Sequence, residues 1–154
     1  MSFPENVVVE RMTDLQWRDF VSTGTRTGKV AIVRRPGLPH VTPVWFLLHR
    51  EGDGVEVVFT TWSNSVKGRT LQEGARFAFC VDDEQPPYSY VMLQCLVGSV
   101  KTETDKIRPW ATRIAERYMG AEQAAAYGER NSVMGELLIV ATVVSVTALS
   151  GIAD

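Results

Sequence analysis

Six apolar, β-branched segments, separated by glycine- or proline-containing turns, constrain the fold of this chain most strongly. They span residues 29–34, 40–50, 55–61, 76–82, 88–102 and 136–149. Segments of this kind are typical of β-strands, and short turns between strands favour antiparallel pairing. We therefore predict a mainly β chain whose six strands form an antiparallel barrel, because closure of a sheet removes its exposed edges.

Prolines and glycines refine this prediction. Pro36 and Gly37 form a strong turn signal, so the first two strands should form a hairpin. Pro43 cannot donate a backbone hydrogen bond, which indicates an edge strand or a bulge in the second segment. Gly98 indicates a bulge in the long fifth segment.

Helical signals lie between the strands. Thr13 or Asp14 is a suitable N-cap for a short helix that ends near Ser22. Helical spacing predicts further helices over residues 63–73, 105–119 and 121–128. A barrel of this size is filled by its own side chains, so a cofactor should bind on its outer surface or at a subunit boundary.

Length and charge narrow the class of protein. The chain fits a single domain over residues 1–154, and its net charge of −2 is not that of a typical nucleic-acid-binding protein. The longest strongly apolar stretch, residues 137–149, is too short to cross a bilayer. Residues 1–10 lack the features of a signal peptide. We expect a cytoplasmic protein without membrane or nucleic-acid partners, in which Cys80 and Cys95 are buried, reduced thiols.

The sequence offers no catalytic motif and no metal motif. His40 and His49 lie nine residues apart on one expected strand, with no acidic or thiol partner at ligand spacing. We therefore predict no metal site. There is no nucleophile elbow, Walker loop or dinucleotide-binding glycine pattern, so the catalytic residues stay unassigned.

The segment 58–71 is the most informative one. It places hydroxyl and amide side chains before a short helix that carries Lys67 and Arg69. Thr60, Thr61 and Ser65 are among the groups that can donate to an anion, and cations and a helix N-terminus would bind phosphate. The alternative is a capped surface helix with solvated cations, and both interpretations stay open.

Four aromatic side chains fall near the expected strand ends or in the connecting loops: Trp45, Trp62, Tyr88 and Tyr90. A planar cofactor ring could stack on them. Packing in the core or at a dimer contact explains them equally well.

The order of these segments resembles the pyridoxamine 5'-phosphate oxidase-like split β-barrel superfamily. Three stretches carry the resemblance: GKVAIVRRPGLPHVTPVWFLL, VVFTTWSNSVKGRTLQEGARFAFCVDD and PPYSYVMLQCLVGSV. In the second, Lys67, Arg69 and Leu71 match the family pattern K-x-R-x-L. Within the superfamily the chain looks most like the small actinobacterial-type oxidoreductases that use FMN or the deazaflavin coenzyme F420.

The resemblance implies a six-stranded antiparallel split β-barrel that forms a homodimer with cofactor sites at the subunit interface. Lys67 and Arg69 would hold the cofactor phosphate. Five further residues would lie along the rest of the cofactor, namely Thr60, Thr61, Ser65, Val44 and Trp45, and Tyr88 or Tyr90 would reach the partner's cofactor.

The cofactor and the reaction follow from the same resemblance. The sequence ends TALSGIAD without the basic motif of true pyridoxamine phosphate oxidases, which argues against vitamin B6 oxidation. Because Lys29, Arg34 and Arg35 could support a polyanionic tail, we expect F420 in preference to FMN. The expected activity is hydride transfer to or from a small organic substrate, since the cofactor carries that chemistry. The alternatives are an FMN-dependent enzyme, a non-catalytic flavin, deazaflavin or haem carrier, and an interaction module without cofactor.

Overall fold

The computed structural model describes residues 9–153, so the N-terminal segment considered above as a targeting signal lies largely outside the described residues. The chain is mainly β, as predicted. The strands are β1 (Glu10–Arg11), β2 (Gly28–Arg34), β3 (Leu38–Val44), β4 (Leu47–Glu51), β5 (Gly54–Trp62), β6 (Arg76–Asp83), β7 (Ser89–Lys101) and β8 (Glu136–Ser150). The helices are α1 (Asp14–Ser22), α2 (Val66–Thr70), α3 (Thr104–Met119) and α4 (Ala121–Arg130).

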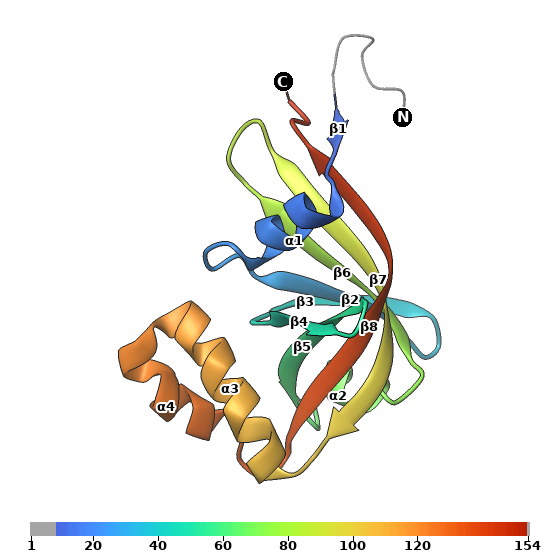
Figure 1. Ribbon diagram of the computed structural model, residues 1–154. Coiled ribbons are helices and arrows are strands. Elements are labelled where there is room, and N and C mark those ends of the chain that lie inside the picture. The colour runs from blue at the N-terminus through green and yellow to red at the C-terminus, as the bar shows by residue number, and fades with distance from the viewer. Residues whose placement is uncertain (1–8, 154) are drawn as a thin grey trace.

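All strands belong to one antiparallel sheet with the order β3-β2-β6-β7-β8-β5-β4, and β1 pairs with the end of β8. The sheet curves into a split barrel but does not close, so β3 and β4 are its end strands (Figure 1). The long strand β8 connects the two halves, since it pairs with both β7 and β5. The split β-barrel prediction is therefore confirmed.

The number of strands differs from the six predicted, chiefly because residues 40–50 form two strands. β3 pairs with β2, whereas β4 pairs with β5 at the other end of the sheet. Trp45 and Phe46 make the connection between β3 and β4. A run of apolar residues does not show where a chain leaves one strand partner for another. The sequence pattern therefore predicts one strand where the structure has two.

Four predictions about the fold that were made from individual residues are confirmed. β2 and β3 form the expected hairpin, and Pro43 lies on the end strand β3, where a missing backbone donor costs least. The register of β7 against β8 shifts between Val97 and Ser99, which places a bulge at Gly98. Thr13 caps α1 in a capping box with Gln16.

The core fills the inside of the curved sheet. Phe46, Phe59 and Phe79 are fully buried, and Phe46 meets Phe79 edge to face at a centroid distance of 4.8 Å. Gly28 leaves room for this cluster, because a Cβ there would lie 1.8 Å from the Phe79 ring. Trp17 from α1 joins the same cluster. The interior is therefore occupied by side chains, as expected for a small barrel.

The helices α3 and α4 form a hairpin that lies outside the sheet beside β4 and β5 (Figure 1). A second apolar cluster joins them, in which Ile107 and Ala111 of α3 pack on Val58 of β5 and Leu138 of β8. Alternate side chains of a strand point to opposite faces. Because Val57 and Phe59 face the main core, Val58 faces α3.

The two cysteines are free thiols. Cys95 is buried, and burial raises its pKa to about 12, whereas Cys80 is half-buried. Over residues 9–153, no helix has the length and apolar character needed to cross a membrane.

Candidate functional site

A cleft of about 390 Å³ lies where the end of β5, the β3–β4 connection and the α3–α4 hairpin meet. The β5–α2 side contributes Thr60, Thr61, Trp62 and Lys67. The β3 side and the helical hairpin supply the other walls. The cleft is thus on the outside of the barrel, as the filled interior requires.

The corner between β5 and α2 is fixed by local hydrogen bonds. The Ser65 hydroxyl accepts a hydrogen bond from the Gly68 N–H at 3.0 Å, which caps α2, and donates to the Trp62 carbonyl at 2.7 Å. A Cβ at Gly68 would lie 2.2 Å from that carbonyl oxygen, so α2 can rest on the end of β5 only with glycine there. The helix is shorter than the predicted 63–73, because residues 63–65 form the turn and cap and the helix ends at Thr70.

Lys67 is the central cation of the cleft. Its Nζ donates to the Thr42 hydroxyl at 2.6 Å, and among the described residues no carboxylate lies within ion-pair distance of it. Burial lowers the pKa of Lys67. An ammonium group has three donors, so a half-buried Lys67 with one protein partner can donate further bonds to an anion in the cleft.

Trp45 is the aromatic residue of the β3–β4 connection that lines the cleft. Its ring stacks on Tyr118 of α3 with a centroid distance of 5.3 Å and an interplanar angle of 4°. The Tyr118 hydroxyl donates to the Arg26 carbonyl at 2.8 Å and accepts from the Phe46 N–H at 3.4 Å. Burial raises the pKa of Tyr118, so the phenol stays neutral. The aromatic wall is therefore held by a stacked ring and two backbone contacts.

Arg117, the neighbour of Tyr118 on α3, supports the backbone that carries Trp45. Its guanidinium donates to three backbone carbonyls, those of Val21 at 2.7 Å, Phe46 at 2.9 Å and Gly24 at 3.0 Å. It also lies over the Phe46 ring at 4.7 Å. Adjacent residues of α3 thus fix the β3–β4 connection that carries Trp45.

Four polar residues of the cleft were not anticipated from the sequence: Thr27, Arg130, Asn131 and Glu136. Burial raises the pKa of Glu136, and the charge of Arg130 acts in the opposite direction. Glu136 reaches the cleft because it pairs with Trp62 across β8 and β5. No local motif encodes that pairing, so sequence reasoning had no signal for it.

Five of the eight predicted site residues line this cleft, namely Val44, Trp45, Thr60, Thr61 and Lys67. Ser65 lies next to it as the helix cap. Arg69 is exposed on α2, and Tyr88 is exposed in the β6–β7 loop; neither lines the cleft of this chain.

The cations proposed for a polyanionic tail lie elsewhere. Lys29 forms an ion pair with Asp82 at 2.7 Å. Arg34 and Arg35 are at the turn end of the β2–β3 hairpin, whereas the cleft adjoins its other end, where Gly28 pairs with Val44. Arg130 is the second cation of the cleft instead.

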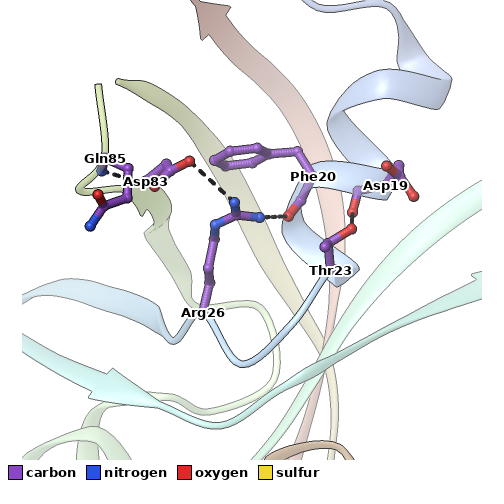
Figure 2. Close-up of polar contacts among 6 residues, drawn as sticks. All are labelled: Asp19, Phe20, Thr23, Arg26, Asp83 and Gln85. Atoms are coloured by element: carbon purple, nitrogen blue, oxygen red, sulfur yellow. Dashed lines mark hydrogen bonds and ion pairs between the residues drawn. The ribbon is translucent and has the colours of Figure 1, made fainter. Parts of the chain in front are cut away.

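A second hollow, beside α1, has a different character. Its arginine, Arg26, is occupied by contacts within the chain, as Figure 2 shows. Arg26 donates to the Phe20 carbonyl at 2.9 Å, forms an ion pair with Asp83 at 3.3 Å and lies over the Phe20 ring at 4.3 Å. Because this charge is neutralised internally, the cleft at Lys67 is the better anion site.

One premise of the sequence analysis is wrong. His49 does have acidic neighbours, since Glu51 and Glu56 bring carboxylate oxygens close to its imidazole. Glu56 lies directly opposite His49 in the β4–β5 register. Spacing along the chain cannot show such a cross-strand pair.

The family model described as pyridoxamine 5'-phosphate oxidase matches residues 14–147, which include every element from α1 to most of β8. The chain belongs to this family. The matched range contains the cleft and all eight predicted site residues.

Several solved structures share the fold of this chain. A protein described as F420 reductase is 22% identical, with a TM-score of 0.64 over 84% of this chain and 94% of that chain. The conserved hypothetical protein Rv2991 from Mycobacterium tuberculosis is 19% identical, with a TM-score of 0.75 over 98% and 91%. An FAD- and haem-binding protein from Mycobacterium smegmatis is 21% identical, with a TM-score of 0.66 over 95% and 75%. No curated protein matches the sequence.

Proposed function

We propose that this family member is an oxidoreductase that binds a phosphate-bearing, flavin-type cofactor in the cleft at Lys67. The cofactor is F420, with FMN as the alternative, and the substrate is a small organic molecule. The observation that carries the proposal is a half-buried ammonium group with a single hydroxyl partner in a cleft walled by Trp45.

The β5–α2 corner suits an anionic group. Lys67 supplies charge-assisted hydrogen bonds, and the hydroxyls of Thr60 and Thr61 line the same cleft. Thr61 is in hydrogen-bond contact with the Ser65 hydroxyl at 3.0 Å, which fixes its orientation. Arg69 is exposed on α2 and does not line the cleft. In this proposal its guanidinium contacts the anionic group of the cofactor from outside the cleft.

The apolar part of the cleft suits a planar ring. Val44 and Trp45 present apolar surface, and Ala111 and Ile114 of α3 close the cleft from the helical side. A bound flavin or deazaflavin supplies hydride transfer. The chain's own task is then to hold the ring, to exclude water and to orient the acceptor, which fits a site without a catalytic dyad.

Arg130 favours the deazaflavin over FMN. It places a second cation in the same cleft as Lys67, and F420 has the longer, polyanionic tail. The names of similar structures support both cofactors, since they include an F420 reductase and an FMN-binding protein. Haem is less well supported, because neither histidine lines the cleft in the described chain.

A homodimer is part of the proposal. Val33, Val41, Val144 and Val146 expose 39–69% of their surface on β2, β3 and β8. Exposed apolar side chains on a sheet are suited to contact with a second copy. In such a dimer Tyr88, which does not line the cleft of its own chain, would approach the partner's cofactor.

The test is a fluorescence titration of the purified protein with F420 and, separately, with FMN. Lys67→Met should weaken binding of the preferred cofactor about ten- to hundredfold, because a charge-assisted hydrogen bond is lost. Lys106→Met, an exposed lysine paired with Glu103, is the matched control and should leave binding unchanged. Binding of neither cofactor, or equal binding by both variants, would contradict the proposal.

Turnover separates an enzyme from a carrier. The protein loaded with reduced cofactor is mixed with a panel of electron-poor organic acceptors, and cofactor oxidation is followed by absorbance. Oxidation that depends on protein, acceptor and Lys67 supports an oxidoreductase. Tight binding without any acceptor-dependent oxidation would favour a carrier.

A further inference from the structure

The outer face of the β4–β5 hairpin gathers one imidazole and two carboxylates outside the cleft. The ligand atoms of His49, Glu51 and Glu56 all lie within 4.8 Å of one another. We propose that these three side chains bind one divalent transition-metal ion of the zinc class. The site is independent of the cofactor proposed above.

The sheet itself positions the three ligands. His49 and Glu56 are directly opposite in the antiparallel register, and Glu51 follows His49 by two residues, so all three project from the same face. On β5 the neighbouring residues Val55 and Val57 are buried in the main core. This burial forces Glu56 outward, and the ligand set therefore rests on paired strands and not on a loop.

Trp110 of α3 holds the histidine. Its ring meets the His49 ring edge to face at a centroid distance of 5.0 Å. The guanidinium of Arg113 lies over the same indole at 4.5 Å. The imidazole is thus packed, whereas the Glu51 side chain is 74% exposed and free to close on an ion.

Charge favours occupation by a dication. Two carboxylates face a single imidazole, and within the described chain the one ion-pair contact that these three side chains form is that of His49 with Glu51, at 3.6 Å. Arg50 lies between His49 and Glu51 in the strand and projects to the other face. A 2+ ion would neutralise the two carboxylates without displacing an existing cation.

The donor set selects the class of metal. Zinc accepts imidazole nitrogen and carboxylate oxygen at about 2.0–2.2 Å, and three protein ligands with one water complete a tetrahedral site. Mg²⁺ and Ca²⁺ prefer six or more oxygen ligands, which this cluster cannot supply. The ligand atoms must draw together to about 3.3 Å, as tetrahedral geometry at these bond lengths requires, and the exposed Glu51 has the freedom to do so.

A bound ion would have a structural consequence. β4 is an end strand of the open sheet and, over residues 9–153, pairs with β5 alone. An ion held by His49 and Glu51 of β4 and by Glu56 of β5 links the end strand to its neighbour. Because the ligands are brought together only in the folded chain, zinc should raise the melting temperature.

The experiment is calorimetric titration of untagged, chelator-treated full-length protein with Zn²⁺, without any cofactor present. The expected result is one ion per chain and a higher Tm with zinc. His49→Gln and Glu56→Gln should each weaken binding at least tenfold, and Glu51→Gln provides an exposed variant that does not disturb packing. His40→Gln, at the other histidine, should bind zinc like the wild type.

Absorption spectroscopy with Co²⁺ identifies the donors. The visible bands of the cobalt protein should lack a thiolate charge-transfer band, which excludes Cys80 as the ligand, and should disappear in Glu51→Gln/Glu56→Gln. No zinc binding by the wild type, or equal binding by the folded His49→Gln and Glu51→Gln/Glu56→Gln variants, would overturn the proposal. Neither result depends on whether F420 or FMN binds in the cleft.

Discussion

The two ends of β5 carry two different polar sites. At one end Thr60 and Thr61 enter the cleft beside Lys67, and at the other end Glu56 faces His49. Between them Val58 packs under α3. The β5–α2 corner of the first site is built from neighbours in the sequence, whereas the second site exists only through the pairing of two strands.

This difference explains why one site was predictable and the other was not. Lys67 follows Thr61 by six residues, so a local pattern of hydroxyls and cations suffices to indicate an anion site. His49 and Glu56 are separated by a turn, and only the hairpin register makes them neighbours. The register of a hairpin is specified by its turn and by the hydrophobic pattern of its strands together. A prediction of metal ligands that considers only spacing along the chain therefore misses Glu56.

The largest expected effect is that of Gly68→Ala, which disturbs the cleft at Lys67 and leaves the site at His49 unchanged. The new methyl group would collide with backbone atoms of Trp62 and Ser63 and displace α2. We expect a loss of about 1–3 kcal/mol in the free energy of unfolding, together with cofactor binding weaker than that of Lys67→Met. Chemical denaturation and titration measure the two effects.

Gly98→Ala is the control for that variant. A Cβ at Gly98 would lie 3.6 Å from the Val140 carbonyl, an ordinary contact. Stability and cofactor affinity should change far less than in Gly68→Ala, and zinc affinity should be unchanged in both. Equal behaviour of the two variants would show that the β5–α2 corner does not hold the cofactor.

A smaller effect is expected from pH, again at the cleft only. An anion binds the charged form of Lys67, and burial lowers the pKa of this lysine in the free protein. Cofactor affinity should therefore fall as the pH rises through the lowered pKa of Lys67 in the free protein. A bound anion favours the charged lysine and so raises its pKa in the complex. The measurement is the Kd as a function of pH between neutral and strongly alkaline solution.

Lys67→Arg separates this effect from titration of the cofactor itself. Arginine keeps its charge at alkaline pH. The variant should therefore lack the fall in cofactor affinity that deprotonation of Lys67 causes in the wild type. Arg130 and Glu136, the other charged residues of the cleft, are present in both proteins. Identical pH profiles for wild type and variant would contradict a role of the Lys67 charge in binding.

The smallest effect is expected for Tyr118→Phe, which tests the aromatic wall. The substitution removes the hydroxyl that contacts Arg26 and Phe46 but keeps the ring that stacks on Trp45. The free energy of unfolding should fall by about 1 kcal/mol, and cofactor affinity should change less than threefold. Tyr118→Ala should weaken binding further, and a similar small change in both variants would mean that the stacked ring does not support the site.

The fold shows the same division between local and long-range information. The N-cap at Thr13, the edge position of Pro43 and the bulge at Gly98 each follow from the chemistry of a single residue. The division of residues 40–50 into β3 and β4 depends on which strands they pair with, and Glu136 enters the cleft by pairing with Trp62. Local rules cannot supply such partners.

The four tryptophans allow one direct measurement of the whole account. Trp45 and Trp62 line the cleft, Trp110 packs on His49, and Trp17 is buried in the main core. In a ¹⁵N–¹H correlation spectrum their indole signals are separate reporters. Addition of F420 or FMN should shift mainly the signals of Trp45 and Trp62, and addition of Zn²⁺ should shift that of Trp110. A cofactor that leaves Trp45 and Trp62 unmoved would contradict the central claim that the cleft at Lys67 is the cofactor site.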